Sequence, residues 1–232
     1  MKDELVIGVL GGMGTYATIH LFEQYAELFK AKKEWDRPRI VIDNRCTMPS
    51  RVRAFLYNEN VDLLVEQMSE SMNGLLSMGC NRIILACNTS HLFLPEIYKR
   101  YPNLKNFVVD IIEKCVGYVA SRGISSVYLL GSEGTIESKV YERALEEEGI
   151  KCDVPSKEDY CILRDCIEAV KTNEYNDGIK NKFLKLVNSR GHCVLGCTEL
   201  PILYEKYKDD VLGVEVFDPL LIGLESIRQE FD

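Results

Sequence analysis

The chain has 232 residues, 46% of them hydrophobic, and a formal net charge of −8. This length suits one large domain or two small ones with real hydrophobic cores. No apolar stretch approaches the roughly 20 residues needed to span a membrane, and no basic tract stands out to neutralise the phosphates of a nucleic acid. The N-terminus lacks the apolar segment and cleavage site of a secretory signal peptide. We therefore expect a cytoplasmic protein that binds neither membranes nor nucleic acid.

Short apolar runs alternate with amphipathic segments along the chain. Strands are predicted at Leu5–Leu10, Arg39–Ile42, Arg82–Ala86, Phe107–Val109, Val127–Leu130, Cys193–Leu195 and Val214–Phe217. Helices are predicted at Thr15–Lys33, Val61–Met78, Ile136–Glu148, Glu158–Val170, Ile179–Ser189 and Pro219–Gln229. Strands that alternate with helices indicate βαβ units, and therefore an α/β fold with mostly parallel sheets.

Three sequence motifs occur twice in the same order. The loops Gly11–Thr15 and Gly131–Thr135 both have the pattern G-x-x-G-T between an apolar run and a helix. Cys87 and Cys197 each follow an apolar run and a small residue, with a threonine close behind. Repetition of this kind predicts two similar halves. The glycines would let the backbone approach a ligand, and the helix that follows would favour a negative group there.

The third repeated motif is an aspartate after a short apolar run, at Asp110 and at Asp218. The helices that follow these aspartates are expected to cross into the opposite half. We therefore predict a first α/β domain of residues 1–112 plus 218–232 and a second of residues 113–217. Pseudo-two-fold symmetry would relate the two domains and place an active site in the cleft between them.

The nine cysteines do not form a disulfide framework, because their number is odd and their spacing irregular. Six of them are expected to be structural or incidental: Cys46, Cys80, Cys115, Cys152, Cys161 and Cys166. The spacing of His192, Cys193 and Cys197 is not that of a zinc knuckle and no partner pair is present, so we predict no metal site.

Cys87 and Cys197 stand where a ligand would bind, because ligands of parallel α/β sheets bind at the carboxyl ends of the strands. Two thiols that flank one cleft suit racemisation, which needs a base on one face of a carbon centre and an acid on the other. The pKa of a thiol, about 8.5 when free, can be tuned toward neutrality for this purpose. Asn88, Thr89 and Thr198 are candidate hydrogen-bond donors to a substrate carboxylate.

These residues resemble the aspartate/glutamate racemase family, and the resemblance covers nearly the whole chain. It is carried by Gly-Val-Leu-Gly-Gly-Met-Gly at 8–14, Ala-Cys-Asn-Thr-Ser-His at 86–91, Gly-Ser-Glu-Gly-Thr-Ile-Glu-Ser at 131–138 and Gly-Cys-Thr-Glu-Leu at 196–200. The resemblance implies that Cys87 and Cys197 are the catalytic pair and that no cofactor is used. The matching motifs also place Met13, Ser90 and Thr135 among the expected substrate-binding residues.

Aspartate-type members of the family carry an arginine after a proline in the loop behind the second strand, and Pro49-Ser50-Arg51 matches it. The family usually has Asp at position 50. A lysine before the second cysteine also contacts substrate in relatives, and Lys171 matches best. Two cations suit a side-chain carboxylate, so the resemblance implies an acidic amino acid as the substrate, aspartate before glutamate. Relatives are often dimers, and we expect a homodimer.

Other functions fit parts of the pattern. Gly12–Ala17 fits the degenerate dinucleotide motif G-x-G-x-x-A, with Asp43 as the ribose ligand, although repetition of the glycine loop counts against it. A non-catalytic clamp for acidic ligands would use the cysteines structurally. Maleate cis–trans isomerases and related decarboxylases also carry paired cysteines, one of them a covalent nucleophile. His91 would orient the thiol of Cys87 or cap the next helix.

Overall fold

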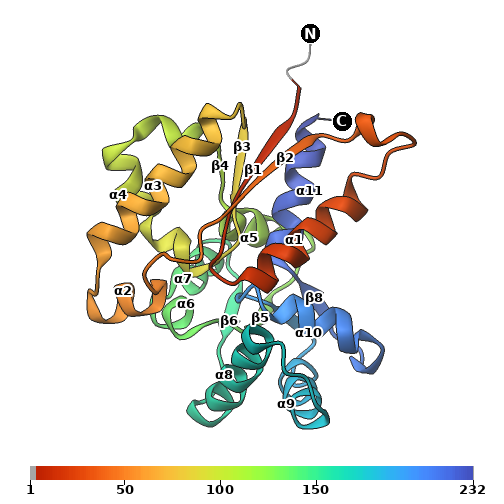
Figure 1. The fold of residues 1–232 in the computed structure, drawn as a ribbon. Helices are drawn as coiled ribbons and strands as arrows, with labels where there is room; N and C mark the ends of the chain where they lie inside the picture. The colour runs from red at the N-terminus through yellow and green to blue at the C-terminus, as the bar shows by residue number, and fades with distance from the viewer. Residues whose placement is uncertain (1–3, 232) are drawn as a thin grey trace.

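The computed structural model describes residues 4–231 and contains two four-stranded parallel sheets, one in each lobe of Figure 1. The first sheet has the order β2-β1-β3-β4, and the second has the corresponding order β6-β5-β7-β8. The strands are β1 (Val6–Gly11), β2 (Arg39–Asn44), β3 (Arg82–Leu85), β4 (Val108–Val109), β5 (Ser126–Leu129), β6 (Lys151–Asp153), β7 (His192–Val194) and β8 (Glu215–Phe217). The predicted α/β class with parallel sheets is confirmed.

Helices connect the strands and cover both sheets. They are α1 (Thr15–Leu28), α2 (Arg51–Tyr57), α3 (Val61–Ser77), α4 (Leu94–Arg100), α5 (Ile111–Ser121), α6 (Glu133–Glu137), α7 (Val140–Glu147), α8 (Lys157–Thr172), α9 (Asp177–Val187), α10 (Leu200–Tyr207) and α11 (Pro219–Phe231). Short 3₁₀ helices lie at Glu34–Asp36, Thr89–Phe93, Pro102–Asn106 and Lys208–Asp210.

One predicted helix is wrong, because the segment expected to be helical from Ile136 to Glu148 forms two helices, α6 and α7. Lys139 lies between them with a φ of 55°, in the left-handed region, where the helix cannot continue. The edge strand β6 and the helices α2, α4 and α10 were not predicted. Each is eight residues or shorter, too short for a clear hydrophobic period.

The repeated aspartates are helix caps. Asp110 Oδ1 accepts hydrogen bonds from the backbone N–H groups of Ile112 (2.9 Å) and Glu113 (3.2 Å), and Asp218 Oδ1 accepts one from Leu220 (2.9 Å). A carboxylate at this position satisfies N–H groups that have no partner within the helix. The aspartates therefore set where α5 and α11 begin after β4 and β8.

α11 returns from the second sheet to contact α1 and β3 of the first, and it also packs on α5, which contacts α7 (Figure 1). One hydrophobic cluster consequently takes residues from both sheets, including Val9 and Ile84 from the first and Leu129 and Val194 from the second. The division of the chain into domains, including the assignment of residues 218–232 to the first domain, stays a prediction.

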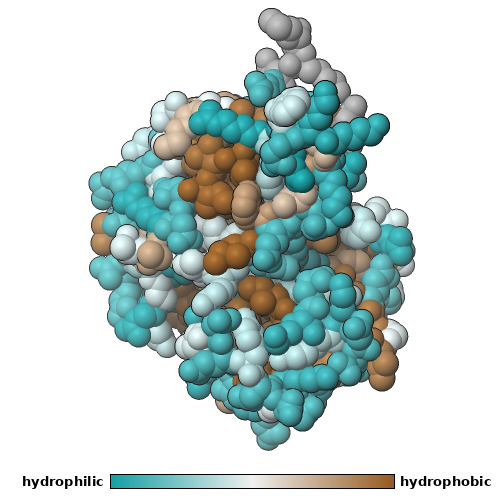
Figure 2. All heavy atoms as spheres, turned by 45° about the vertical axis from the view of Figure 1, so that its right-hand side comes forward, coloured by the Kyte–Doolittle hydropathy of each residue, from teal (hydrophilic) through white to brown (hydrophobic). Residues whose placement is uncertain are grey.

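Within residues 4–231, no helix is long and apolar enough to cross a membrane. The face of the molecule in Figure 2 is mostly hydrophilic, with apolar patches between the polar residues. On α1, the large side chains of Tyr16, Ile19 and Phe22 are exposed.

The packing of α11 depends on Gly223. A Cβ at this position would lie 2.9 Å from Ile111 Cγ2 and 3.2 Å from Ile84 Cδ1. Gly223→Ala should therefore destabilise the protein, although alanine favours helix. At Gly117 in α5 a Cβ would meet nothing within 4 Å, so Gly117→Ala should stabilise by about 0.5–1 kcal/mol. Denaturant unfolding of both variants checks the pair, and equal effects of the two substitutions would contradict this account of the packing.

Candidate active site

The loops after β3 and β7 bring Cys87 and Cys197 to one small cavity of about 90 Å³. Both thiols are buried, each with 8% exposure. The other predicted site residues that line this cavity are Met13, Arg51, Asn88, Thr89, Lys171 and Thr198. They come from both halves of the chain.

Two predicted site residues, Ser90 and Thr135, do not line the cavity. Ser90 is buried, and its Oγ donates to the carbonyl oxygen of Cys87 (2.6 Å). Thr135 is buried with its Oγ1 3.0 Å from Thr89 Oγ1. Both residues position a loop of the site.

Hydrogen bonds cross between the halves directly beside the two cysteines. Tyr141 Oη donates to Asn88 Oδ1 (2.5 Å), and Thr198 Oγ1 donates to the carbonyl oxygen of Ala86 (3.2 Å). The hydroxyls of Thr89 and Ser132 are 2.8 Å apart. The amide nitrogen Asn88 Nδ2 is buried and has no hydrogen-bond partner in the described part of the chain, so a donor in the cavity wall is left for a ligand oxygen.

Arg51 begins α2 and is held by the backbone on the cavity wall. Its Nη2 donates to the carbonyl oxygen of Met13 (2.8 Å) and its Nη1 to that of Pro49 (3.0 Å). Both acceptors are neutral, which leaves the charge of the guanidinium for an anionic ligand, and the buried Nε has no partner. Ser50 caps α2 by accepting from Arg53 N (3.3 Å), so the residue that departs from the family pattern still has a structural task.

Lys171 lies at the end of α8, with its side chain 44% exposed and its Nζ 2.8 Å from Glu168 Oε1. Burial alone would lower its pKa. The hydrogen bond to Glu168 and the negative charges of Glu199 and Glu168 outweigh burial, so the pKa of Lys171 is raised and the ammonium stays charged beside the cavity.

Glu199, which sequence reasoning did not select, is the closest polar partner of a cysteine in the cavity. It is 3% exposed, and Cys197 Sγ donates to its Oε2 at 3.0 Å. Burial, then the charge and hydrogen bond of Glu199, raise the pKa of Cys197 well above its usual value. Cys197 is therefore a thiol at neutral pH. The motif Gly-Cys-Thr-Glu-Leu contained this residue, and only the burial of its carboxylate distinguishes it from a surface glutamate.

His91 lies inside the 3₁₀ helix Thr89–Phe93 and orients the loop of Cys87. It does not cap the next helix, α4, whose N-cap is Phe93. Its Nδ1 donates to the Cys87 carbonyl oxygen (3.0 Å), while its buried Nε2 has no partner. Burial lowers the pKa of His91, although the charge of Asp110 opposes this shift. His91 is therefore neutral at neutral pH.

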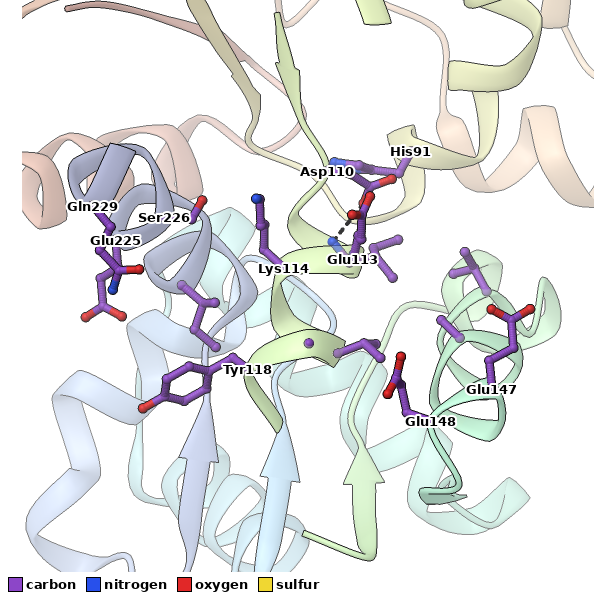
Figure 3. Close-up of a pocket in the computed structure, with 16 residues that line it drawn as sticks. His91, Asp110, Glu113, Lys114, Tyr118, Glu147, Glu148, Glu225, Ser226 and Gln229 are labelled. Carbon is purple, nitrogen blue, oxygen red and sulfur yellow. Dashed lines mark hydrogen bonds between the residues drawn. The ribbon is translucent and has the colours of Figure 1, made fainter. Parts of the chain in front are cut away.

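A larger cavity, about 640 Å³, lies on the surface of α5 between α11 and α7 (Figure 3). None of the predicted site residues lines it. His91 and Asp110 lie together at one end of it, and its remaining charged groups are four glutamates and one lysine, Glu113, Glu147, Glu148, Glu225 and Lys114.

No group of three histidine, cysteine or carboxylate side chains among the described residues is arranged to hold a metal ion. Cys193, part of the zinc pattern considered from the sequence, is fully buried in β7.

The fold and the cavity together define an α/β protein of two lobes with a small polar site between them. Each lobe contributes one cysteine to the lining of this site, Cys87 from the first and Cys197 from the second. A family model described as Asp/Glu/Hydantoin racemase matches residues 10–227. The chain therefore belongs to the Asp/Glu/hydantoin racemase family.

Individual relatives agree with this assignment. The glutamate racemase of Aquifex pyrophilus is 27% identical over 159 residues, which are 68% of this chain and 61% of the relative; the match thus spans less than two thirds of that protein. The fold is similar to Picrophilus torridus aspartate racemase, with a TM-score of 0.84 and 24% identity over 97% of this chain and 94% of that one. An aspartate racemase homologue from Pyrococcus horikoshii OT3 has a TM-score of 0.75 and 25% identity, covering 97% of both chains.

Burial of neutral His91 makes stability depend on pH. Because its folded pKa lies below the value of 6.5 that applies when it is exposed, the unfolded state binds a proton first as the pH falls. Stability is then lost below about pH 6.5, by up to about 1.4 kcal/mol per pH unit. His91→Asn keeps a hydrogen-bond donor toward the Cys87 carbonyl oxygen. This variant should lose the share of the pH dependence of the unfolding free energy that comes from His91. Urea unfolding of both proteins from about pH 7.5 to about pH 5 tests it; parallel slopes would show that His91 does not contribute.

Proposed function

We propose that this chain is an amino-acid racemase that inverts the Cα of an acidic amino acid by proton transfer between Cys87 and Cys197. The observation that carries the proposal is the meeting of these two thiols, from corresponding strands of two similar halves, at one cavity. Family membership supports the reaction type. The scheme needs no cofactor, because each thiol can serve as base or acid.

The mechanism follows from the groups around the cavity. One cysteine, as thiolate, takes the Cα proton from one face of the substrate, and the other, as thiol, returns a proton to the opposite face. The carbanion between these steps gains from hydrogen bonds to the α-carboxylate, for which Asn88 Nδ2 is an unpartnered donor. Thr89 and Thr198 line the same wall and are proposed to help hold that carboxylate.

The preferred substrate is aspartate and then glutamate. Arg51 and Lys171 line the cavity with two positive charges, and the acceptors that Arg51 has among the described residues are the carbonyl oxygens of Met13 and Pro49. A second carboxylate on the substrate would neutralise them, and the guanidinium offers the planar geometry that suits it.

The small cavity argues against the dinucleotide alternative. Ligand pockets of drug-sized molecules usually have volumes of about 300–1,000 Å³, far above the roughly 90 Å³ found here. The glycine loops are also occupied by protein. A Cβ on Gly12 would lie 2.5 Å from the backbone of Arg45 and Cys46, and one on Gly134 would lie 2.9 Å from Thr89 Cγ2.

A homodimer and a cytoplasmic location complete the proposal. The apolar face of α1, formed by Tyr16, Ile19 and Phe22, is exposed in the single chain, as expected of a surface that pairs with a second copy.

The two-thiol mechanism predicts the result of incubation with L- and D-aspartate, then L- and D-glutamate, in heavy water. Deuterium should be incorporated at Cα whichever enantiomer of at least one acidic amino acid is supplied, and chiral chromatography should show conversion to the other enantiomer. Cys87→Ser and Cys197→Ser should each reduce inversion by about 10²- to 10⁴-fold, since serine is a poor acid or base at neutral pH.

Cys161→Ser, at an exposed position on α8, is the matched control and should keep full activity. Inversion that survives in either catalytic-pair variant contradicts the mechanism. Aspartate binding without deuterium incorporation would indicate the non-catalytic clamp, and turnover of maleate with a covalent adduct on one cysteine would indicate the isomerase alternative.

The substrate assignment predicts a selective effect at Arg51. Arg51→Gln should reduce kcat/KM for aspartate by about 10- to 150-fold, the value of a lost hydrogen bond to a charged group, with the change mainly in KM. Arg53→Gln is the control, because Arg53 lies on the same helix but pairs with Glu59 at the surface. Equal losses in both variants would remove Arg51 from substrate recognition.

A further inference from the structure

The buried carboxylate of Glu199 lies beside Cys197 and takes no part in the proton transfer between the two thiols. Glu199 is the N-cap residue of α10 and is almost fully buried, with one oxygen, Oε2, accepting from Cys197 Sγ at 3.0 Å. Its other oxygen, Oε1, is buried and has no hydrogen-bond partner among residues 4–231. A buried carboxylate is costly unless its charge is compensated or it exchanges a proton.

The surroundings of Glu199 favour a carboxylate there. A Cβ on Gly14 would lie 2.5 Å from Oε1, so the glycine at the N-terminus of α1 leaves the space that this oxygen fills. The N-terminus of a helix favours negative charge, and Lys171 lies close enough for its pKa to be raised by Glu199. Glu199 thus lies between a positive side chain, a helix N-terminus and one thiol.

We propose that Glu199 is the immediate proton acceptor of Cys197, so that the thiol and the carboxylate share one buried proton and act as a single acid–base unit. This inference rests on the proposed racemase function for its use in catalysis, but the shared proton itself is a property of the free protein. Glu199 acts through Cys197 and is a positioning residue for that proton.

The protons balance over one turnover. One turnover of the proposed cycle begins with one proton on each sulfur and none on the Glu199 carboxylate. Glu199 accepts the proton of Cys197, and the resulting thiolate removes the Cα proton from the substrate face that it meets. Cys87 then gives its proton to the opposite face and becomes a thiolate. After the product leaves, Cys197 passes its proton to the Cys87 thiolate and Glu199 returns its proton to Cys197, with which it shares a hydrogen bond, so that the starting state is restored.

The sharing makes the amount of Cys197 thiolate independent of pH over the neutral range, because the proton moves within the protein and is not released. Other titratable or charged groups lie near Cys197 and Glu199. Cys87, Arg51 and Lys171 line the same cavity, and Glu168 is hydrogen-bonded to Lys171. Tyr160 interacts electrostatically with Cys197. None of these groups accepts a hydrogen bond from Cys197 Sγ among the contacts of the described residues; Glu199 does.

Alkylation of the free protein by iodoacetamide tests the sharing directly. The rate at Cys197 follows its thiolate fraction, and peptide mass spectrometry resolves it from Cys193, a fully buried neighbour in the same peptide. In the wild type the rate should be low and nearly constant from about pH 6 to about pH 8. An isolated thiol would instead gain about tenfold per pH unit in this range, and such a slope in the wild type overturns the proposal.

Three variants separate proton transfer from a structural role. Glu199→Gln keeps the shape of the side chain and cannot take a proton, so its alkylation rate at Cys197 should rise about tenfold per pH unit. Glu199→Asp keeps the carboxylate and should restore at least part of the plateau. Glu205→Gln, on the same helix and paired with Lys208 at the surface, is the control and should behave as the wild type.

The pH profile of kcat/KM gives a second readout. In the wild type the acid limb reports protonation of a carboxylate–thiol unit, whereas in Glu199→Gln it reports protonation of a thiolate. The limb should therefore move up by at least about two pH units in Glu199→Gln and stay in place in Glu205→Gln. A uniform loss of activity with an unmoved limb would assign Glu199 a purely structural role.

The two proposals can fail separately. If no amino acid is racemised but the pH-independent plateau of Cys197 alkylation is present, the proposed function fails and the shared proton stands. If racemisation is found and wild-type alkylation has the slope of an isolated thiol, the function stands and this inference fails. Should Glu199→Gln fail to fold, the wild-type plateau alone still decides.

Discussion

The hydrogen bonds that cross between the halves at the cysteine loops are the constraint on which the site depends. Each cysteine lies next to a residue that is bound to the opposite half. Asn88, after Cys87, accepts from Tyr141, and Thr198, after Cys197, donates to Ala86, which precedes Cys87. Because these contacts are buried, leaving one of them unmade would cost about 1–3 kcal/mol. The positions of both thiols are therefore fixed by the junction between the lobes and not by either lobe alone.

Much of this arrangement was predictable because it depends on periodicity and repetition. The strand–helix alternation gave the parallel sheets, and the duplicated setting at Cys87 and Cys197 predicted that both would lie at one cavity. The repeated aspartates were recognised as a pair, and their role as caps of α5 and α11 follows from the position of a carboxylate directly before a helix. Local chemistry of this kind can be read from the order of residues.

Contacts between distant segments could not be predicted. The glycine loops were expected to give a ligand access to the backbone, but Gly14 makes room for Glu199 and Gly134 for Thr89; a glycine does not indicate which neighbour it admits. Glu199 was missed because glutamate is seldom buried and nothing in Gly-Cys-Thr-Glu-Leu marks burial. Ser90 and Thr135 belong to the matched motifs, yet their hydroxyls point to protein partners and not to the cavity.

The symmetry of the fold does not extend to the chemistry around its two thiols. The carbonyl oxygen of Cys87 is held by Ser90 and His91, whereas the sulfur of Cys197 is bound to a carboxylate. Such asymmetry is compatible with racemisation. The two mirror-image substrates have equal free energies in water, so kcat/KM must be the same in both directions whatever the catalytic groups are. In the proposed mechanism unequal thiols would instead change how each enantiomer divides that shared ratio between kcat and KM, because one enantiomer would lose its proton to Cys197, the thiol bound to Glu199, and the other to Cys87.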